Sequence, residues 1–286
     1  MRGARIALAT CTGFAELKAD DELLLAALRE RGFAAEPAVW DEEGLEWGRF
    51  DLCLVRSTWD YEDKHREFLE WARRVERETA LWNPAETIVW NSDKRYLEEL
   101  ARRGVPTVPT AWVEPGSGIV LEELLAERGW DEAVVKPAVD LGARNLRRAR
   151  AGAADGALEA VLRRGEAMVQ PFLPSLEEDG ELSLVFIAGE LTHAVRKRPA
   201  AGDFRVQSSW GGTVRREEPA EPERELATQA LADLRPQPLY ARVDLVRDLA
   251  GDPALIELEL IEPNLSLREN PTAVDALAAA VAARLR

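Results

Sequence analysis

Carboxylates gather near the end of the chain, with a spacing that could hold a metal ion. Asp244 lies in the apolar run LYARVDLV, and Glu257, Glu259, Glu262 and Asn264 lie in the run LIELELIEPNLSL that follows. Both runs predict β-strands, joined by a short polar hairpin turn. A carboxylate in an apolar strand is costly unless it is paired or binds a metal. Carboxylate and amide oxygens suit a hard cation such as Mg²⁺, with phosphate oxygens completing its coordination.

Strand alternation divides these acids between two faces. Glu257 and Glu259 are two residues apart and share a face, whereas Glu262 falls on the other face if the strand stays regular. Arg242 lies on the same face as Asp244, so a cation and a metal-binding acid are expected to face the same space. The alternative interpretation is a sheet with one solvated face, because charged residues are seldom fully buried.

Two lysines could hold an anion. Lys136 lies inside the apolar strand VVKPA, where an unpaired ammonium is costly, so we expect it to meet an acid or a phosphate. Lys94 falls in the first turn of a helix that Asn91 or Ser92 could cap. A cation there opposes the helix dipole. Lys94 is therefore either a solvated surface residue or a neighbour of an anionic ligand.

Arginines mark two further candidate sites. Arg56 ends the third predicted strand, where a parallel sheet binds ligands, and its guanidinium could hold a substrate carboxylate. The alternative there is a purely structural turn, with Asp60 capping the next helix. A basic segment runs from Arg196 through Arg205 to Gly211. It predicts either a lid over a phosphate site or a mobile surface loop.

Composition excludes several classes of protein. The chain has 286 residues, 46% of them hydrophobic, with 37 Lys and Arg against 52 Asp and Glu and a net charge of −15. This charge argues against a nucleic-acid or anionic-membrane partner. No apolar run approaches the ~18 residues of a membrane span, and a cytoplasmic protein is expected. Cys11 and Cys53 lie in apolar runs and predict buried free thiols. His65 is expected to be exposed on a helix, and His193 to be a packed strand residue.

The first 60 residues read as strand, helix, strand, strand, which predicts a small α/β layer of the βαβ kind. No Gly-x-Gly-x-x-Gly fingerprint follows the first strand. Further strands are predicted at 107–113, 133–139, 145–149, 167–172, 181–187 and 191–197, and helices at 19–31, 65–78, 91–103, 121–127, 157–164, 217–232 and 272–286.

An ordered series of motifs resembles the ATP-grasp superfamily. Asn91-x-Asp93-Lys94 and Val134-Val135-Lys136-Pro137 look like its two nucleotide lysines. The run MVQPFL, with Gln170 and Phe172, looks like the hinge whose backbone reads adenine. Glu181 resembles the acid that binds the ribose hydroxyls.

The later motifs point to particular ligases. The loop with GDFR and paired glycines is similar to the loop over the triphosphate in bacterial glutathione synthetase. Arg242-Val243-Asp244 and Glu262-Pro263-Asn264 match the arginine and metal ligands of that enzyme and of D-alanine–D-alanine ligases. RSTWDY, VQPFLPS, HAVRKRPAAGDFRVQ and ELELIEP resemble the ligases typified by the O-ureido-serine cyclo-ligase of cycloserine biosynthesis. Two features depart from these patterns: the loop at 140–144 has few glycines, and Gln207 replaces an asparagine of glutathione synthetase.

The resemblance implies an α/β (α+β) ATP-grasp fold with a Rossmann-like pre-ATP-grasp domain at 1–90. A central subdomain is expected at 91–172, and a C-terminal subdomain carrying the metal site at 173–286. It also implies ATP and Mg²⁺, with a substrate carboxylate converted to an acyl phosphate that an amine then attacks. The alternatives are intermolecular ligation and an ATP-binding protein without ligase activity. The expected partner is an amino-acid-like small molecule, with a possible homodimer.

The roles that the resemblance implies are specific. Arg242 faces the developing oxyanion or the transferred phosphate, and Glu259 replaces a metal ligand if the strand register is shifted. The phosphates are expected to be bound by Lys94, Lys136, Arg205 and Gly211, and the adenosine by Gln170, Phe172 and Glu181. Mg²⁺ is expected to be bound by Asp244, Glu262 and Asn264, and the substrate carboxylate by Arg56 and Arg196.

Overall fold

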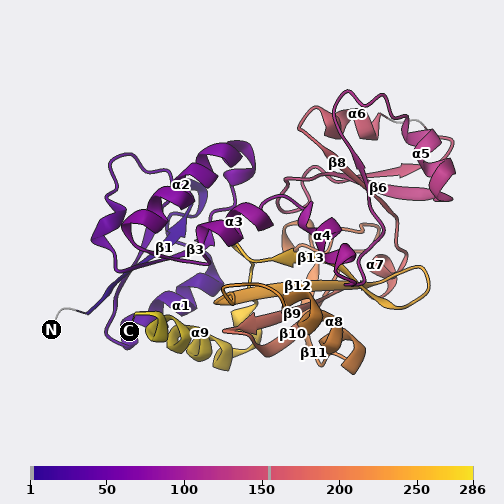
Figure 1. The fold of residues 1–286 in the computed structure, drawn as a ribbon. Helices are drawn as coiled ribbons and strands as arrows, with labels where there is room; N and C mark the ends of the chain where they lie inside the picture. Colours follow the sequence, from indigo (N-terminus) through magenta and orange to yellow (C-terminus); the bar gives the residue numbers. More distant parts are fainter. Residues whose placement is uncertain (1–2, 154–155, 286) are drawn as a thin grey trace.

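The computed structural model describes residues 3–153 and 156–285, which build three sheets (Figure 1). The first is parallel, with the order β2-β1-β3-β4. Its strands are β1 (Arg5–Thr10), β2 (Ala34–Val39), β3 (Leu52–Ser57) and β4 (Ala80–Trp82). The predicted α/β layer is therefore confirmed.

Helices cover both faces of this parallel sheet, which is why its strands are apolar almost throughout. Alternate β1 residues face opposite cores: Ile6 packs with α1 (Ala19–Glu30), and Ala7 packs with α2 (His65–Glu78). The C-terminal helix α9 (Pro271–Arg284) joins the core of α1 (Figure 1). The end of the chain thus returns to its beginning. Arg286, the predicted end of this helix, lies outside the described residues.

The second sheet is antiparallel, with the order β5-β8-β6-β7. Val135 and Val169 pack with Leu125 and Leu158 of two helices that lie against the sheet. Its elements are β5 (Ala111–Val113), α5 (Leu121–Arg128), β6 (Glu132–Pro137), β7 (Arg147–Arg150), α6 (Ala157–Leu162) and β8 (Ala167–Pro171).

The third sheet is also antiparallel, with the order β11-β10-β9-β12-β13. Its strands are β9 (Glu181–Ile187), β10 (Glu190–Arg198), β11 (Thr213–Glu217), β12 (Tyr240–Arg247) and β13 (Pro253–Glu259). Leu182 and Leu184 pack on Leu226 of α8 (Glu221–Leu231). The predicted hairpin of β12 and β13 is confirmed. The helix predicted from residue 217 begins later, because β11 precedes it.

The helix predicted at 91–103 is shorter and begins later, as α4 (Tyr96–Arg102), and a separate short helix, α3 (Ala85–Asn91), precedes it. Asn91 ends the first of them. Its side-chain amide donates to Leu258 O at 2.8 Å and accepts from Leu260 N at 2.7 Å, so it fixes the end of β13. The described short elements are α7 (Ser175–Glu178), η1 (Thr12–Phe14), η2 (Trp47–Arg49), η3 (Tyr61–Lys64), η4 (Ser208–Trp210) and η5 (Leu267–Glu269).

Several residue-level predictions can be compared with the structure. Cys11 and Cys53 are buried free thiols, as predicted. His193 is packed, with its Nε2 3.0 Å from Leu265 O. His65 is half-buried rather than exposed, because it contacts the Ser92 hydroxyl at 2.9 Å. None of the described helices is both long and apolar enough to span a membrane.

Candidate active site

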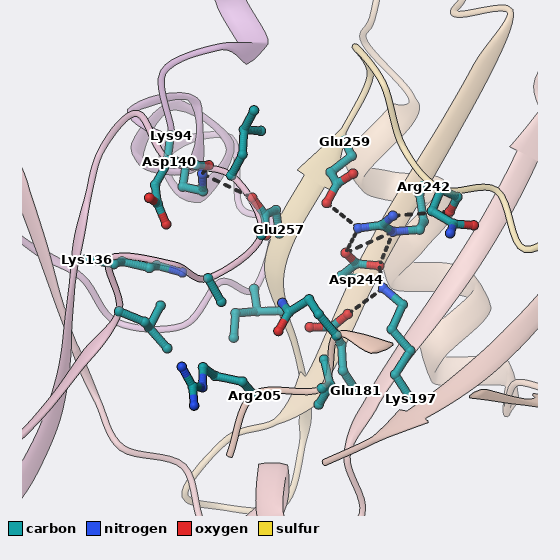
Figure 2. Close-up of a pocket in the computed structure, with 18 of the residues that line it drawn as sticks. Lys94, Lys136, Asp140, Glu181, Lys197, Arg205, Arg242, Asp244, Glu257 and Glu259 are labelled. Carbon is teal, nitrogen blue, oxygen red and sulfur yellow. Dashed lines mark hydrogen bonds and ion pairs between the residues drawn. The ribbon is translucent and has the colours of Figure 1, made fainter. Parts of the chain in front are cut away.

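A cavity of about 670 Å³ opens where the three sheets meet. Tyr61 lines it from beside the parallel sheet, Lys136 and Gln170 from the second sheet, and Glu181 and Asp244 from the third. Figure 2 shows the charged side chains of Lys136, Glu181 and Asp244 converging from separate strands. A cavity of this size can take a nucleotide-sized or drug-sized ligand.

The two predicted lysines both reach the cavity and are both buried. Lys94 Nζ donates to Asp140 O at 2.7 Å and forms an ion pair with Glu257 at 3.2 Å. Lys136 has no hydrogen-bond or ion-pair partner within the part of the chain that the structure describes (Figure 2). Burial lowers the pKa of Lys136, because an ammonium without a partner is poorly solvated there. Lys136 is therefore a preformed position for an anion.

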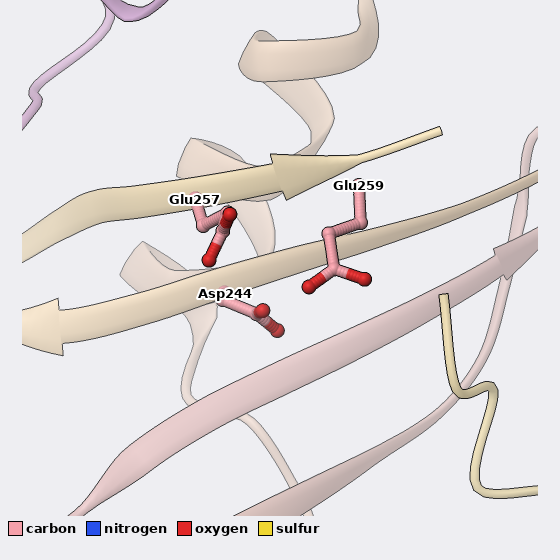
Figure 3. Close-up of side chains that lie close together, drawn as sticks. All are labelled: Asp244, Glu257 and Glu259. Carbon is pink, nitrogen blue, oxygen red and sulfur yellow. The ribbon is translucent and has the colours of Figure 1, made fainter. Parts of the chain in front are cut away.

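Three carboxylates form one cluster across β12 and β13 (Figure 3). Asp244, Glu257 and Glu259 each offer an oxygen, and these atoms lie within 4.8 Å of one another. The antiparallel register places Glu257 opposite Asp244, and alternation puts Glu259 on the same face. Such an all-oxygen group fits Mg²⁺.

The predicted metal set shares Asp244 with this cluster. Glu262 and Asn264 follow the end of β13 at Glu259 and line the same cavity. Glu259, the predicted alternative ligand, is in the cluster together with Glu257.

Arg242 balances the charge of this cluster. Its Nε donates to Asp244 Oδ1 at 2.9 Å, its Nη2 also pairs with Glu259, and its Nη1 donates to Asn264 O at 3.1 Å. Burial disfavours ionisation of Asp244, but Arg242 and Lys197 outweigh it and lower the pKa of Asp244 to about 2. Asp244 is therefore ionised at neutral pH.

Lys197 is a site residue that the sequence interpretation missed. Its Nζ lies 2.9 Å from Glu181 Oε1 and 3.6 Å from Asp244 Oδ1, and its side chain lines the cavity. The predicted Arg196 points to the other face, where it pairs with Glu217 at 2.5 Å. The structure therefore does not bring Arg196 to the cavity. The register of β10 against β9 sets Lys197 opposite Glu181, so Lys197 faces the cavity and the neighbouring Arg196 does not.

Arg56 does not reach the cavity either. It is 1% exposed, its Nε pairs with Asp21 at 2.7 Å, and its Nη2 donates to Pro263 O at 2.8 Å. Its guanidinium also lies 5.0 Å from the centroid of the Tyr240 ring. Arg56 therefore holds the backbone of the segment that follows β13 in place. Asp60 occupies the N-cap position of η3 but makes no side-chain capping hydrogen bond, and its carboxylate accepts from Trp40 Nε1 at 2.8 Å.

Two loops meet over the mouth of the cavity. Arg205 lines it, pairs with Asp203 at 2.7 Å and lies 3.4 Å from the centroid of the Trp210 ring. Trp210 Nε1 in turn donates to Gly142 O at 3.2 Å. Gly211 is next to this contact but does not line the cavity. The predicted basic segment therefore touches the glycine-poor loop at 140–144.

The predicted hinge is present in part. Gln170 lines the cavity and donates to Thr110 Oγ1 at 2.9 Å. The Phe172 ring does not line it and instead packs 3.6 Å from the Arg148 guanidinium. The backbone N–H of Phe172 is also used, because it donates to Glu132 O at 2.9 Å. Glu181, the predicted ribose ligand, does line the cavity.

Comparison with known proteins agrees with this geometry. Residues 6–83 match the family model described as D-cycloserine synthetase DcsG, N-terminal domain. Residues 117–264 match the model described as prokaryotic glutathione synthetase, ATP-grasp domain. Cycloserine biosynthesis protein DcsG of Streptomyces lavendulae is 34% identical, covering 98% of this chain and 99% of that protein. A glutathione synthetase of Prochlorococcus marinus is 32% identical over 55% of this chain and 59% of its own length.

Comparison with solved structures identifies the fold. The crystal structure of D-cycloserine synthetase DcsG superposes with a TM-score of 0.90 at 32% identity. The match covers 99% of this chain and 100% of the DcsG chain. A D-alanine–D-alanine ligase from Bacillus anthracis, complexed with ATP, has a TM-score of 0.74 at 15% identity, covering 99% and 95% of the two chains. The second likeness concerns the fold alone. With its cavity between three sheets and its similarity to DcsG over nearly the whole length, this chain belongs to the ATP-grasp ligases, in the family that includes DcsG.

Proposed function

We propose that this C–N bond-forming ligase uses ATP and Mg²⁺ to activate the carboxylate of an amino-acid-like substrate and then closes a ring on it. The observation that carries the proposal is the cavity, where a cluster of three carboxylates lies in one space with a buried lysine that has no partner in the described ranges 3–153 and 156–285. The similarity to DcsG extends over both the N-terminal domain and the ATP-grasp part, which supports a cyclising reaction. We also propose that the enzyme acts in the cytoplasm, as a homodimer.

The cations of the cavity suit the phosphates of ATP. Lys136 has no partner among the described residues, and a phosphate oxygen would supply one. Lys94 and Arg205 already have acidic partners, so each would share its donors between protein and nucleotide. Gln170 and Glu181 both line the cavity and would contact the adenosine part.

Asp244, together with Glu262 and Asn264 or with the neighbouring Glu257 and Glu259, would hold Mg²⁺, because all five line one cavity and oxygen ligands are what this ion prefers. Bound there, the ion would offset the negative charge that develops in phosphoryl transfer. Arg242 holds two of these carboxylates in place by its hydrogen bonds.

The reaction then follows from positioning and charge neutralisation. A substrate carboxylate oxygen attacks the γ-phosphorus of ATP, the bond from that phosphorus to the bridging oxygen breaks, and ADP leaves. The resulting acyl phosphate is attacked at its carbonyl carbon by a nitrogen of the same molecule. Phosphate leaves with the bonding pair, and the nitrogen loses a proton. Arg242 would stabilise the oxyanion or the phosphate as this charge forms.

ADP release tests the proposal directly. Mg²⁺-ATP is supplied with a panel of amino-acid carboxylates that includes O-ureido-D-serine, with and without hydroxylamine to trap acyl phosphate. We expect ADP release that depends on one carboxylate, a trapped hydroxamate, and a cyclic product without an added amine. Release that requires a second amine would identify an intermolecular ligase. ATP binding without release for any carboxylate would favour a binding protein and contradict the proposal.

Lys197 and Arg196 offer a matched pair for the site assignment. We expect Lys197→Met to lower turnover by about 10- to 100-fold, because it removes the cation between Glu181 and Asp244. Arg196→Met should leave turnover near the wild-type value and lower the melting temperature, because it unpairs Glu217 on the other face. Steady-state ADP release and thermal unfolding of both variants check this. The opposite ranking of the two turnover numbers would show that β10 presents Arg196, not Lys197, to the substrate.

A further inference from the structure

A lysine near the start of the chain lines the cavity, and the proposed mechanism does not use it. Lys18 directly precedes α1, and its ammonium lies 4.5 Å from the centroid of the Phe14 ring and 4.4 Å from that of the Trp59 ring. All three residues line the cavity. Aromatic faces attract cations, so the two rings hold Lys18 in position. They leave its charge without a counterion.

Most cations of the cavity wall are already neutralised by the protein. Among the described residues, seven lysines and arginines line the cavity, and five of them pair with an acid: Lys94, Arg144, Lys197, Arg205 and Arg242. The other two, Lys18 and Lys136, have no acidic partner in the ranges 3–153 and 156–285. Lys136 belongs to the second sheet and is assigned to the phosphates of ATP. Lys18 is therefore the cation that is available for a different anion.

The acids that follow Lys18 in the first turn of α1 have other partners. Asp21 pairs with Arg56 Nε at 2.7 Å, and Asp20 Oδ2 accepts from Leu267 N at 2.8 Å. Lys18 itself occupies the N-terminal end of this helix, where the helix dipole disfavours a cation and favours an anion. Both the free charge of Lys18 and its position in the helix thus indicate an anionic ligand.

The backbone before Lys18 has an unusual conformation. Leu17 has a φ of 70°, a left-handed conformation that glycine adopts readily and leucine does not, and its side chain packs in the core of α1. Its N–H donates to Phe14 O at 2.7 Å and closes a turn. Such strained residues are concentrated at binding sites. The turn places Leu17 in the core while Lys18, the next residue, reaches the cavity.

The surroundings of Lys18 are connected to the segment that follows β13. Trp59, one of the two rings beside the ammonium, donates from its Nε1 to Glu262 O at 3.0 Å. This segment carries Glu262 and Asn264, the residues that the sequence predicts as Mg²⁺ ligands. An anion bound by Lys18 would therefore lie near the proposed site of phosphoryl transfer.

We propose that Lys18 binds the substrate carboxylate that ATP activates. This inference rests on the proposed function, because it names the residue that holds the reacting group. Arg56 and Arg196, the residues predicted for this contact, do not reach the cavity. The Lys18 ammonium donates to one carboxylate oxygen and leaves the other free to attack the γ-phosphorus. Because the two rings restrict the lysine, the carboxylate is held in one orientation before it reacts.

Lys18→Met tests this contact, because methionine keeps an unbranched side chain and removes the charge. The matched control is Lys64→Met. Lys64 also lies over an aromatic ring, 5.7 Å from the Trp40 centroid, but it pairs with Asp41 and does not line the cavity. The probes are O-ureido-D-serine and the same molecule with a carboxamide in place of its carboxylate. ADP release gives kcat and the KM of O-ureido-D-serine and of ATP, and inhibition gives the Ki of the carboxamide.

We expect Lys18→Met to raise the KM of O-ureido-D-serine by about 10- to 100-fold, as for loss of a charge-assisted hydrogen bond. The kcat should change far less, because the contact is made before phosphoryl transfer. The KM of ATP and the Ki of the carboxamide should stay near their wild-type values, and Lys64→Met should match the wild type throughout. A Lys18→Met enzyme that keeps the wild-type KM for O-ureido-D-serine overturns the inference. An equal rise in the KM of ATP also overturns it, since Lys18 would then bind a phosphate.

Failure of the proposed function gives a different result. In that case the wild-type enzyme binds ATP but releases no ADP with O-ureido-D-serine. Thermal shifts with Mg²⁺-ADP and each probe then decide about Lys18 alone. A larger shift with the carboxylate than with the carboxamide, lost in Lys18→Met and kept in Lys64→Met, supports the contact. Equal shifts with the two probes in the wild-type enzyme, including no shift with either, contradict it.

Discussion

Replacing Asp244 with asparagine is expected to lower turnover by on the order of 10³-fold, the largest effect of any single change in this chain. Asparagine keeps the shape of the side chain and can still accept the Ser183 hydroxyl, which lies 2.5 Å from Oδ1. It removes the negative charge that a metal ion needs. Because the pKa of Asp244 is lowered to about 2, the wild-type residue is a full carboxylate at any working pH.

The fold should survive this change. Arg242 keeps Glu259 and Asn264 O as partners, so it is not left as an isolated buried charge. Asp248→Asn, in the hairpin turn after β12, is the matched control and should have wild-type turnover. ADP release measures activity, and circular dichroism with thermal unfolding measures the fold. Near-normal turnover in Asp244→Asn would remove Asp244 from the metal site.

Period-two patterns made much of the third sheet predictable. The hairpin of β12 and β13 and the shared face of Glu257 and Glu259 follow from alternation alone. Side-chain alternation applies only within a strand. Glu262 lies beyond the end of β13, so neither its face nor its neighbours could be derived from the strand. The prediction of Glu262 and Asn264 as metal ligands therefore came from the resemblance of Glu262-Pro263-Asn264 to the ATP-grasp ligases and not from strand alternation.

Contacts between segments that are far apart in the sequence could not be predicted from local sequence patterns. Arg56 looked like a substrate ligand because it ends a strand, but Asp21 of α1 pairs with it. Choosing between Arg196 and Lys197 required the register of β10 against β9, which sets Lys197 opposite Glu181. The docking of α9 on α1 joins residues more than 200 apart, and helical periodicity says nothing of such partners.

Lys136 and Lys94 look equivalent in the sequence, yet the structure predicts opposite effects on stability. Lys136→Met should raise the melting temperature of the ligand-free protein. It replaces a buried ammonium, which has no partner within the described part of the chain, by an apolar side chain of similar length. Lys94→Met should lower the free energy of unfolding by about 1–3 kcal/mol, because it leaves Glu257 without its cation.

Both variants should nevertheless lose ATP affinity, by about 10- to 100-fold each, because each lysine can donate to a phosphate. Thermal unfolding of the ligand-free proteins and calorimetric titration with a non-hydrolysable ATP analogue measure the two effects separately. A lower melting temperature for Lys136→Met would mean that its ammonium is already stabilised by the protein. Unchanged ATP affinity would contradict its role at the phosphates. A gain in stability together with a loss of affinity is expected only of a charge that the fold keeps buried for its ligand.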